Sequence, residues 1–167
     1  DPLSIEDYEA HGGFKGLERA KRLSSAEIVS EVTESGLRGR GGAGFPAGIK
    51  WKTVLDAKAD QKYICCNADE GDSGTFADRI LMEADPFTLI EGMAIAALAV
   101  GATKGYIYIR SEYPAAIVQM RKAIEIAKPK LGNLELKVRV GAGSYVCGEE
   151  TAMLESIEGK RGVVRAK

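Results

Sequence analysis

The residues best suited to chemistry lie in a glycine-rich stretch at positions 36–51, where six of the sixteen residues are glycine. Glycine lets backbone N–H groups approach a ligand closely, and successive N–H groups form a concavity that favours an anion. Two arginines and a lysine in this stretch add positive charge, and Phe45 offers a flat apolar face for a ring. The pattern predicts a loop for a phosphorylated, aromatic cofactor.

Other interpretations of this stretch compete. A Gly-x-Gly-x-x-Gly pattern begins at Gly39, but the dinucleotide fingerprint requires a preceding strand, and residues 26–34 are typical of a helix. A P-loop phosphotransferase would need Gly-Lys-Ser/Thr after the glycines, and none follows. A flexible connector is the remaining alternative, although such a linker is not expected to carry two aromatic residues and a proline. We favour a phosphate cradle of a less common kind.

Two further polar stretches follow segments that are typical of strands. Residues 67–78 leave a short apolar segment, 62–66, which is predicted to be a buried strand, and ligands of open α/β sheets bind at that end of a strand. Residues 141–151 combine glycines with Tyr145 and two glutamates at a predicted helix start. The alternatives are a solvated turn for the first stretch and simple helix-start electrostatics for the second.

The elements that position these stretches alternate between helix and strand. Ser24 and Glu27 form a capping-box pattern before a helix, and Asp85 with Pro86 is typical of a cap and first residue of another. Further segments are predicted as follows: helices at 49–58, 86–100, 114–128 and 149–158, and strands at 106–110 and 134–140. This alternation predicts an α/β fold, a Rossmann-like three-layer domain with a mostly parallel sheet.

Composition limits the class of protein. The 167 residues are 45% hydrophobic and 28% charged, with a net charge of −1, so nucleic acid is not indicated as a partner. Three cysteines without a C-x-x-C pair suit a reducing compartment, and we expect a cytoplasmic protein, free or peripheral to a membrane complex, without a metal site of its own. The apolar run at 93–100 is too short to span a bilayer. Residues 1–23 are predicted to form an N-terminal arm, either a docking arm or a surface flap, and residues 24–167 the ligand-binding domain.

The motifs resemble those of the flavoprotein subunits of respiratory NADH dehydrogenase (complex I). This family includes the diaphorase subunits of NAD-reducing hydrogenases and of NAD-dependent formate dehydrogenases. The matching motifs are Gly36-Leu-Arg-Gly-Arg-Gly-Gly-Ala-Gly-Phe-Pro, Cys66-Asn-Ala-Asp-Glu-Gly, Asp85-Pro-Phe, Leu89-Ile-Glu-Gly-Met and Gly141-Ala-Gly-Ser-Tyr-Val-Cys-Gly-Glu-Glu-Thr. The segments at 70–79 and 110–114 look most like the formate dehydrogenase branch.

The resemblance implies an oxidoreductase with FMN as prosthetic group and NADH or NAD+ as substrate. Residues implied in FMN binding are Gly39, Arg40, Gly41, Lys50, Asn67, Asp69, Glu70, Tyr145, Gly148, Glu149 and Glu150. Residues implied in binding the dinucleotide are Phe45, Asp72, Glu150 and Lys167. The glycine loop would hold the FMN phosphate, and no side chain is expected to act as an acid or base in the hydride step, because the cofactor supplies that chemistry.

The chain also departs from the family pattern. Asp72 stands where respiratory members usually carry glutamate. In the family, a further FMN-binding segment, a ubiquitin-like domain and a [4Fe–4S] domain follow, so the chain is expected to be truncated after Lys167, with iron–sulfur electron-transfer subunits as partners of the whole assembly. The competing interpretation is a non-catalytic nucleotide-binding or assembly fragment of such a subunit.

Overall fold

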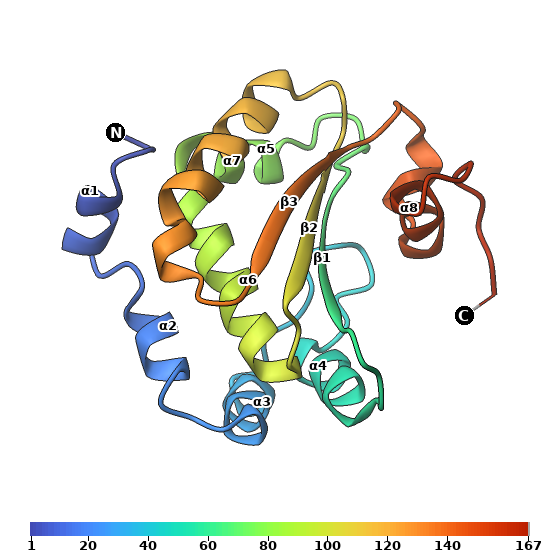
Figure 1. Cartoon of the computed structure of the whole chain (residues 1–167). Coiled ribbons are helices and arrows are strands. Elements are labelled where there is room, and N and C mark those ends of the chain that lie inside the picture. The colour runs from blue at the N-terminus through green and yellow to red at the C-terminus, as the bar shows by residue number, and fades with distance from the viewer. Residues whose placement is uncertain (167) are drawn as a thin grey trace.

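The computed structural model describes residues 1–166, which form a three-stranded, wholly parallel sheet with helices on both faces (Figure 1). The strands are β1 (Tyr63–Ala68), β2 (Lys104–Ile109) and β3 (Glu135–Val140), paired in the order β1-β2-β3. In the register, Cys65 lies beside Tyr106, which lies beside Lys137. The predicted α/β class and parallel sheet are therefore confirmed.

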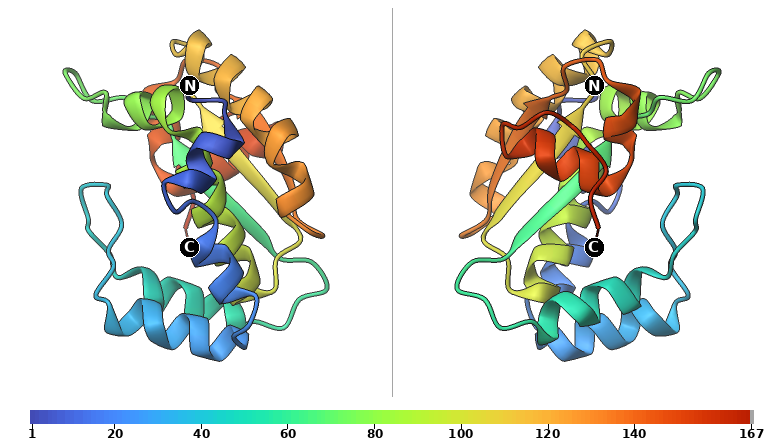
Figure 2. Two further views of the ribbon diagram at one scale, coloured as in Figure 1. Left: turned by 90° about the vertical axis from the view of Figure 1, so that its left-hand side faces the viewer. Right: turned by 90° about the vertical axis from the view of Figure 1, so that its right-hand side faces the viewer.

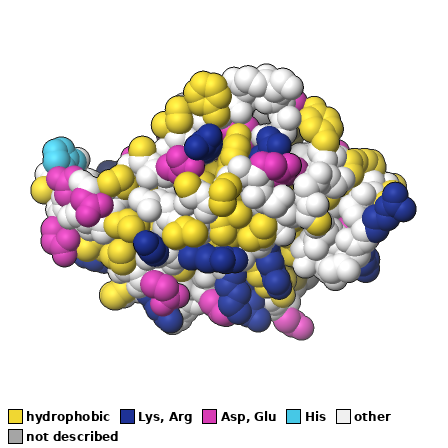
Figure 3. All heavy atoms as spheres, turned by 90° about the horizontal axis from the view of Figure 1, so that it is seen from above, with side chains coloured by type: hydrophobic (Ala, Val, Ile, Leu, Met, Phe, Trp, Pro, Cys, Tyr) yellow, Lys and Arg dark blue, Asp and Glu magenta, His cyan; other side chains and the backbone are white. Residues whose placement is uncertain are grey.

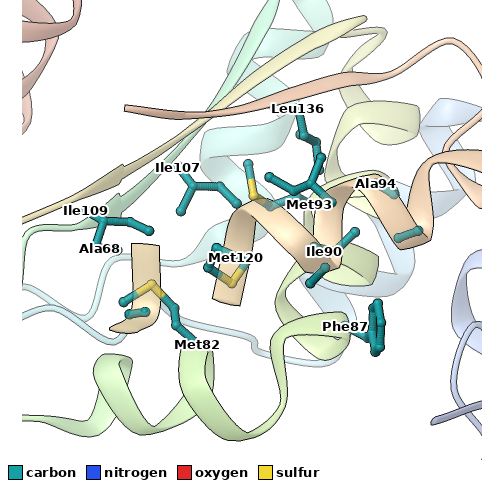
Figure 4. Packing of buried hydrophobic residues seen from close by; sticks show 14 of the residues in the cluster. Ala68, Met82, Phe87, Ile90, Met93, Ala94, Ile107, Ile109, Met120 and Leu136 are labelled. Atoms are coloured by element: carbon teal, nitrogen blue, oxygen red, sulfur yellow. The ribbon is translucent and has the colours of Figure 1, made fainter. Parts of the chain in front are cut away.

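Three helices cover one face of the sheet and enclose the main core: α5 (Ala77–Ala84), α6 (Pro86–Val100) and α7 (Pro114–Ala127). The predicted apolar face of α7 is buried at Ile117, Met120 and Ile124. Figure 4 shows Met93 of α6 directed toward Ile107 and Leu136 of the sheet. A short 3-10 helix, η1 (Lys128–Lys130), then leads to β3.

The opposite face of the sheet is covered by α8 (Glu150–Ile157), which follows the 3-10 helix η2 (Tyr145–Gly148). Tyr108 of β2, Cys147 and Met153 form a second, smaller buried cluster there. The Tyr108 hydroxyl lies 2.8 Å from Ser156 Oγ, so the cluster is closed by a hydrogen bond. Helices, sheet and helix make the three predicted layers.

Helices α3 (Ser25–Glu34) and α4 (Ala47–Asp56) pack against each other near the amino ends of the strands. The predicted capping box of α3 is present, because Ser24 Oγ accepts from Glu27 N and the Glu27 carboxylate accepts from Ser24 N. A Cβ added to Gly48 would lie 2.8 Å from Thr33 Cα, so the close contact of the two helices requires glycine at this position. The glycine-rich stretch is the connection between them.

The N-terminal arm is packed against the core, so of the two predicted alternatives it is not a surface flap, and the docking arm stays a prediction. It forms α1 (Ile5–Ala10) and α2 (Lys15–Ala20), and Phe14 and Leu17 are buried in the main core. Glu91 of α6 binds this segment, accepting hydrogen bonds from Tyr8 Oη at 2.6 Å, Phe14 N at 2.8 Å and Leu17 N at 2.9 Å. The carboxylate thereby caps α2 from a distant helix.

Several local predictions need correction. Strand β1 is an edge strand and half-buried, with Tyr63 48% exposed, although a buried strand was predicted. Helix α5 was not predicted at all. Asp85 stands at the start of α6 but its side chain caps no backbone group and accepts from Thr88 Oγ1 at 2.6 Å. Within residues 1–166, no helix is long and apolar enough to cross a membrane.

Candidate functional site

The loops that leave the three strands meet at the carboxyl edge of the sheet, the upper end in Figure 1. Asn67 Nδ2 donates to the carbonyl of Gly148 at 2.8 Å, and Tyr145 Oη donates to Asp72 Oδ1 at 2.7 Å. A Cβ on Gly71 would lie 2.8 Å from the Tyr145 ring, so glycine allows the ring to approach the backbone here. The second and third predicted stretches are therefore joined directly to each other.

Asp69 carries an unusual group at this edge. Its Oδ2 atom is buried and has no hydrogen-bond partner among residues 1–166. A Cβ placed on Gly148 would lie 3.7 Å from this oxygen, so the absence of a side chain at Gly148 leaves space beside it. Burial raises the pKa of Asp69, and the positive charge of Arg110 acts in the opposite direction. A buried polar atom without a partner in the protein is suited to accept a hydrogen bond from a ligand.

Glu70 is buried, and its carboxylate is bonded to protein groups. It accepts from Asp78 N at 2.8 Å and, more weakly, from Arg79 N at 3.4 Å, which are the first-turn donors of α5. The Tyr113 hydroxyl donates to the same carboxylate at 2.9 Å. The side chain of Glu70 thus caps α5 and fixes the loop at residues 69–76 to the end of β2.

The two glutamates at the start of α8 differ in their contacts. Glu149 is the N-cap, and its carboxylate accepts from Thr151 N at 2.9 Å, Ala152 N at 3.0 Å and Thr151 Oγ1 at 2.6 Å. This is the helix-start role that the sequence left open as an alternative. Glu150 lies 3.6 Å from Lys50 Nζ, an ion pair that links α8 to α4.

The glycine-rich stretch forms a hairpin at residues 36–46 that projects from the body on the same side as the loop at 69–76 (Figure 2). Gly39 N donates to Phe45 O at 2.9 Å, and Gly44 N donates to Gly41 O at 3.1 Å, which closes the tip. The N–H groups of residues 40–43 have no hydrogen-bond partner anywhere in residues 1–166. Such a row of donors at a glycine tip is suited to an anion.

Side chains at the base of the hairpin complete its connection to α8. Lys50 Nζ lies 5.8 Å from the centroid of the Phe45 ring, and Phe45 is 45% exposed. Lys50 therefore faces both an exposed aromatic ring and the carboxylate of Glu150. The Arg40 side chain is exposed at the tip. Lys167, the last predicted dinucleotide contact, lies outside the described residues.

The surface seen from the carboxyl edge mixes cationic, acidic and hydrophobic side chains without a large patch of one sign (Figure 3). A hollow of about 430 Å³ adjoins the Lys50–Glu150 pair. Its lining consists of Cys65, Glu150, Thr151, Met153, Leu154, Arg165 and Ala166. A second hollow, of about 480 Å³, lies between α7 and β3, away from the predicted site residues. Among residues 1–166, no cluster of three or more His, Cys, Asp or Glu side chains is placed to bind a metal ion.

Sequence reasoning from the residues alone did not identify Arg110 and Tyr113 as part of this edge. They follow β2 directly, and both bond to the loop at residues 69–76. The signal was present, because polar and aromatic residues after a parallel strand lie at the same edge as those after its neighbours.

Residues 32–167 match the family described as the Nuo51 FMN-binding domain. The chain belongs to this family. It is the flavoprotein family of complex I and related hydrogenases, as the resemblance implied, and FMN is the cofactor of the family's domain. The α/β fold with its parallel sheet agrees with this membership.

Relatives are found in several assemblies. The chain is 52% identical to the NADP-reducing hydrogenase subunit HndC of Solidesulfovibrio fructosivorans over 97% of its length and 35% of that subunit. It is 52% identical to an NADH-quinone oxidoreductase subunit of Rhizobium meliloti (strain 1021), over 98% of the chain and 41% of the relative. A crystal structure of an NAD+-reducing [NiFe]-hydrogenase in the air-oxidized state matches with a TM-score of 0.80 at 43% identity, over 86% of this chain and 25% of that one. The chain thus spans between a quarter and about two-fifths of the proteins that it matches.

Proposed function

We propose that this domain binds FMN and NAD(H) side by side at the carboxyl edge of its sheet, as the electron-entry or electron-exit module of a larger oxidoreductase. The observation that carries the proposal is the buried Oδ2 of Asp69, which has no partner within residues 1–166 and lies where the loops of β1 and β3 meet. An ordinary solvated turn has no reason to bury a carboxylate oxygen without a partner. The hairpin adds unpartnered N–H groups for a phosphate.

The residues present fit a flavin in distinct ways. The N–H groups at the tip, with Gly39, Arg40, Gly41 and Lys50, would receive the phosphate, since they combine backbone donors with positive charge. Asn67 and Asp69 would receive polar groups of the ribityl chain or ring, because both hold oxygen atoms at the strand end. The carboxylate of Glu70 already serves α5 and Tyr113, so we assign it the support of this loop. Tyr145, Gly148 and Glu149, which follow β3, would line the side of the flavin site across from Asn67 and Asp69.

FMN, when bound, supplies the exchange of a hydride with the nicotinamide and of single electrons with iron–sulfur clusters. The protein then has to position the rings and exclude water. Phe45 would stack on the dinucleotide, and Tyr145 and Asp72, already joined by a hydrogen bond, would border its nicotinamide end. Glu150, held by Lys50, would accept hydrogen bonds from ribose hydroxyls.

The preferred nucleotide and the parent assembly belong to the proposal as well. Relatives carry names that refer to NADP and to NADH, so family membership leaves the choice open. We propose NADH or NAD+, since a 2′-phosphate near Glu150 and Asp72 would face like charge. We further propose iron–sulfur subunits as partners, in a cytoplasmic or membrane-peripheral complex, with the formate dehydrogenase branch suggested by residues 70–79 and 110–114.

A titration with FMN tests the proposal. The flavin-free chain should quench FMN fluorescence with a saturable, one-to-one response. Asp69→Asn, which keeps the shape of the side chain but removes its charge, should weaken binding about tenfold, the scale of a hydrogen bond to a charged group. Asp60→Asn is the matched control, because Asp60 is an exposed acid in the loop that precedes β1, whereas Asp69 follows the carboxyl end of that strand. Absence of saturable quenching by the unmodified chain would contradict the proposal.

The alternative is a domain that binds nucleotide without turnover. Anaerobic addition of NADH to the FMN-loaded chain separates the two. Loss of the flavin absorption band indicates hydride transfer, whereas FMN binding without any bleaching indicates the binding fragment.

A further inference from the structure

The turn at residues 110–113, directly after β2, holds the loop at residues 69–76 in place. The Arg110 guanidinium donates through Nη1 to the carbonyl of Glu70, and it lies 5.2 Å from the centroid of the Tyr113 ring. The Tyr113 hydroxyl donates to the Glu70 carboxylate at 2.9 Å and to the Thr75 carbonyl at 3.3 Å. The turn at residues 110–113 therefore binds both the backbone and the side chain of Glu70.

The guanidinium is itself held in a defined orientation. Arg110 Nε donates to Glu112 Oε2 at 3.4 Å, and Nη2 lies 3.3 Å from Glu112 Oε1, a two-point ion pair. A Cβ added to Gly143, in the loop after β3, would lie 3.7 Å from Ser111 Oγ and 4.0 Å from Glu112 Oε1. The turn at residues 110–113 thus lies next to the loop after β1, through Glu70, and next to the loop after β3, through Gly143.

The same guanidinium acts on the charge of Asp69. Burial raises the pKa of this carboxyl, Arg110 lowers it, and Glu112 raises it. Burial, and to a smaller extent the charge of Asp69, raises the pKa of Tyr108 of β2 to about 12. Among these groups Arg110 is the positive one, so it favours the ionised form of a carboxylate whose Oδ2 atom is buried without a partner.

We propose that Arg110 is a positioning residue for the flavin site: it holds the backbone of Glu70, the residue next to Asp69, and thereby places a positive charge near Asp69. The inference rests on the proposed function, because Asp69 is the predicted flavin ligand. Arg110 acts through Asp69 and the loop and does not itself contact the cofactor. If Arg110 had a purely structural role, it would support the loop without affecting the protonation of Asp69.

Two substitutions separate these roles. Arg110→Lys keeps the charge but loses the planar donor fork, and Arg110→Gln loses the charge. Amide hydrogen exchange at residues 69–78 of the flavin-free protein reports the hold on the loop, and we expect roughly tenfold faster exchange in Arg110→Gln. The FMN dissociation constant, measured between pH 4.5 and 8, reports the charge. The FMN phosphate titrates in the same way for every variant, so differences between variants belong to the protein.

The expected result is specific to each variant. Arg110→Gln should bind FMN about tenfold more weakly near pH 5.5, with the midpoint of its pH dependence moved upward, because loss of the positive charge makes Asp69 easier to protonate. Arg110→Lys should keep the midpoint of the unmodified protein. If Arg110→Gln matched the unmodified protein in FMN affinity, in pH midpoint and in amide exchange, the inference about Arg110 would be overturned and the proposed function would stand. The same holds if loop exchange increased but Arg110→Gln and Arg110→Lys had the same pH midpoint. Failure of the unmodified protein to bind FMN would overturn the proposed function and, with it, the role of Arg110 toward a flavin.

Discussion

The hairpin at residues 36–46 is held by hydrogen bonds within itself and with its flanking residues, whereas the loop at residues 69–76 is fixed by side chains from other segments. In the hairpin, Gly39 and Phe45 pair through their backbones, and the N–H groups of residues 40–43 have no partner within residues 1–166. In the loop, Tyr113 and Tyr145 each donate to an acidic side chain. We therefore expect the hairpin to adapt to a phosphate and the loop to be preorganised for the groups that must be placed accurately.

This difference predicts that substitutions in the hairpin affect ligand binding and not folding. Gly41→Val should abolish flavin retention, because a branched side chain would cover the N–H groups of the tip. A Cβ at Gly41 meets no protein atom within 4 Å and its φ is not left-handed, so circular dichroism and the melting temperature should stay native. Gly92→Val is the matched control, because Gly92 is exposed on α6 away from the hairpin and a Cβ there likewise meets no protein atom within 4 Å. Full flavin occupancy in purified Gly41→Val would show that the tip is not the phosphate site.

Substitutions in the loop at residues 69–76, in contrast, should lower the stability of the fold. Glu70→Ala removes the cap of α5 and leaves the Tyr113 hydroxyl without its closest acceptor, so we expect a loss of about 2–4 kcal/mol in the free energy of unfolding. Arg40→Ala, on the exposed hairpin tip, should change it by no more than about 0.5 kcal/mol. Urea denaturation of the two variants measures the contrast directly. Equal stabilities would remove the distinction between the two regions.

Glu150 of α8 is joined to the base of the hairpin, because Lys50 pairs with it. We expect kcat/KM for NADH to exceed that for NADPH by at least about tenfold, and Glu150→Gln to reduce the ratio by relieving like-charge repulsion. The comparison should be made at low and high salt, since screening weakens charge repulsion. Equal use of both nucleotides by the unmodified protein would refute the preference. An unchanged ratio in Glu150→Gln would move its source to another residue, with Asp72 the next to test.

The smallest effect concerns the cysteines of β1, which we expect to be structural. Burial raises the pKa of Cys65, and it raises the pKa of Cys66 to about 12. Because the unfolded thiol ionises near pH 8.5, stability attributable to Cys66 should be present below that pH and should fall as the pH rises toward 12. At pH 8, labelling of the folded protein by a thiol reagent should be slow compared with the urea-unfolded chain. Rapid labelling accompanied by loss of NADH oxidation would contradict a structural role.

Local patterns were enough to predict the parts of the fold that depend on near neighbours. The capping box at Ser24 and the apolar face of α7 involve residues three or four positions apart, and both are present. Family membership was also predictable, because the motifs at the hairpin and strand ends are specific. The ligand contacts of the individual site residues stay predictions.

Features that depend on distant partners could not be predicted in the same way. Helix α5 is capped by Glu70, which lies outside its own sequence pattern, and its polar start resembled a loop. The N-terminal arm is held by Glu91, more than seventy residues away, and nothing local to the arm indicates that contact. Strand β1 is apolar in sequence, yet its place at the edge of the sheet leaves it half-buried.

We propose that the hairpin and the carboxyl edge together place FMN beside a nicotinamide. The most direct measurement is the absorption spectrum of the FMN-loaded chain during anaerobic titration with NADH. We expect the flavin band to bleach in proportion to the NADH added and to return when air is admitted. A chain that holds FMN stoichiometrically and keeps its spectrum unchanged at saturating NADH would contradict it.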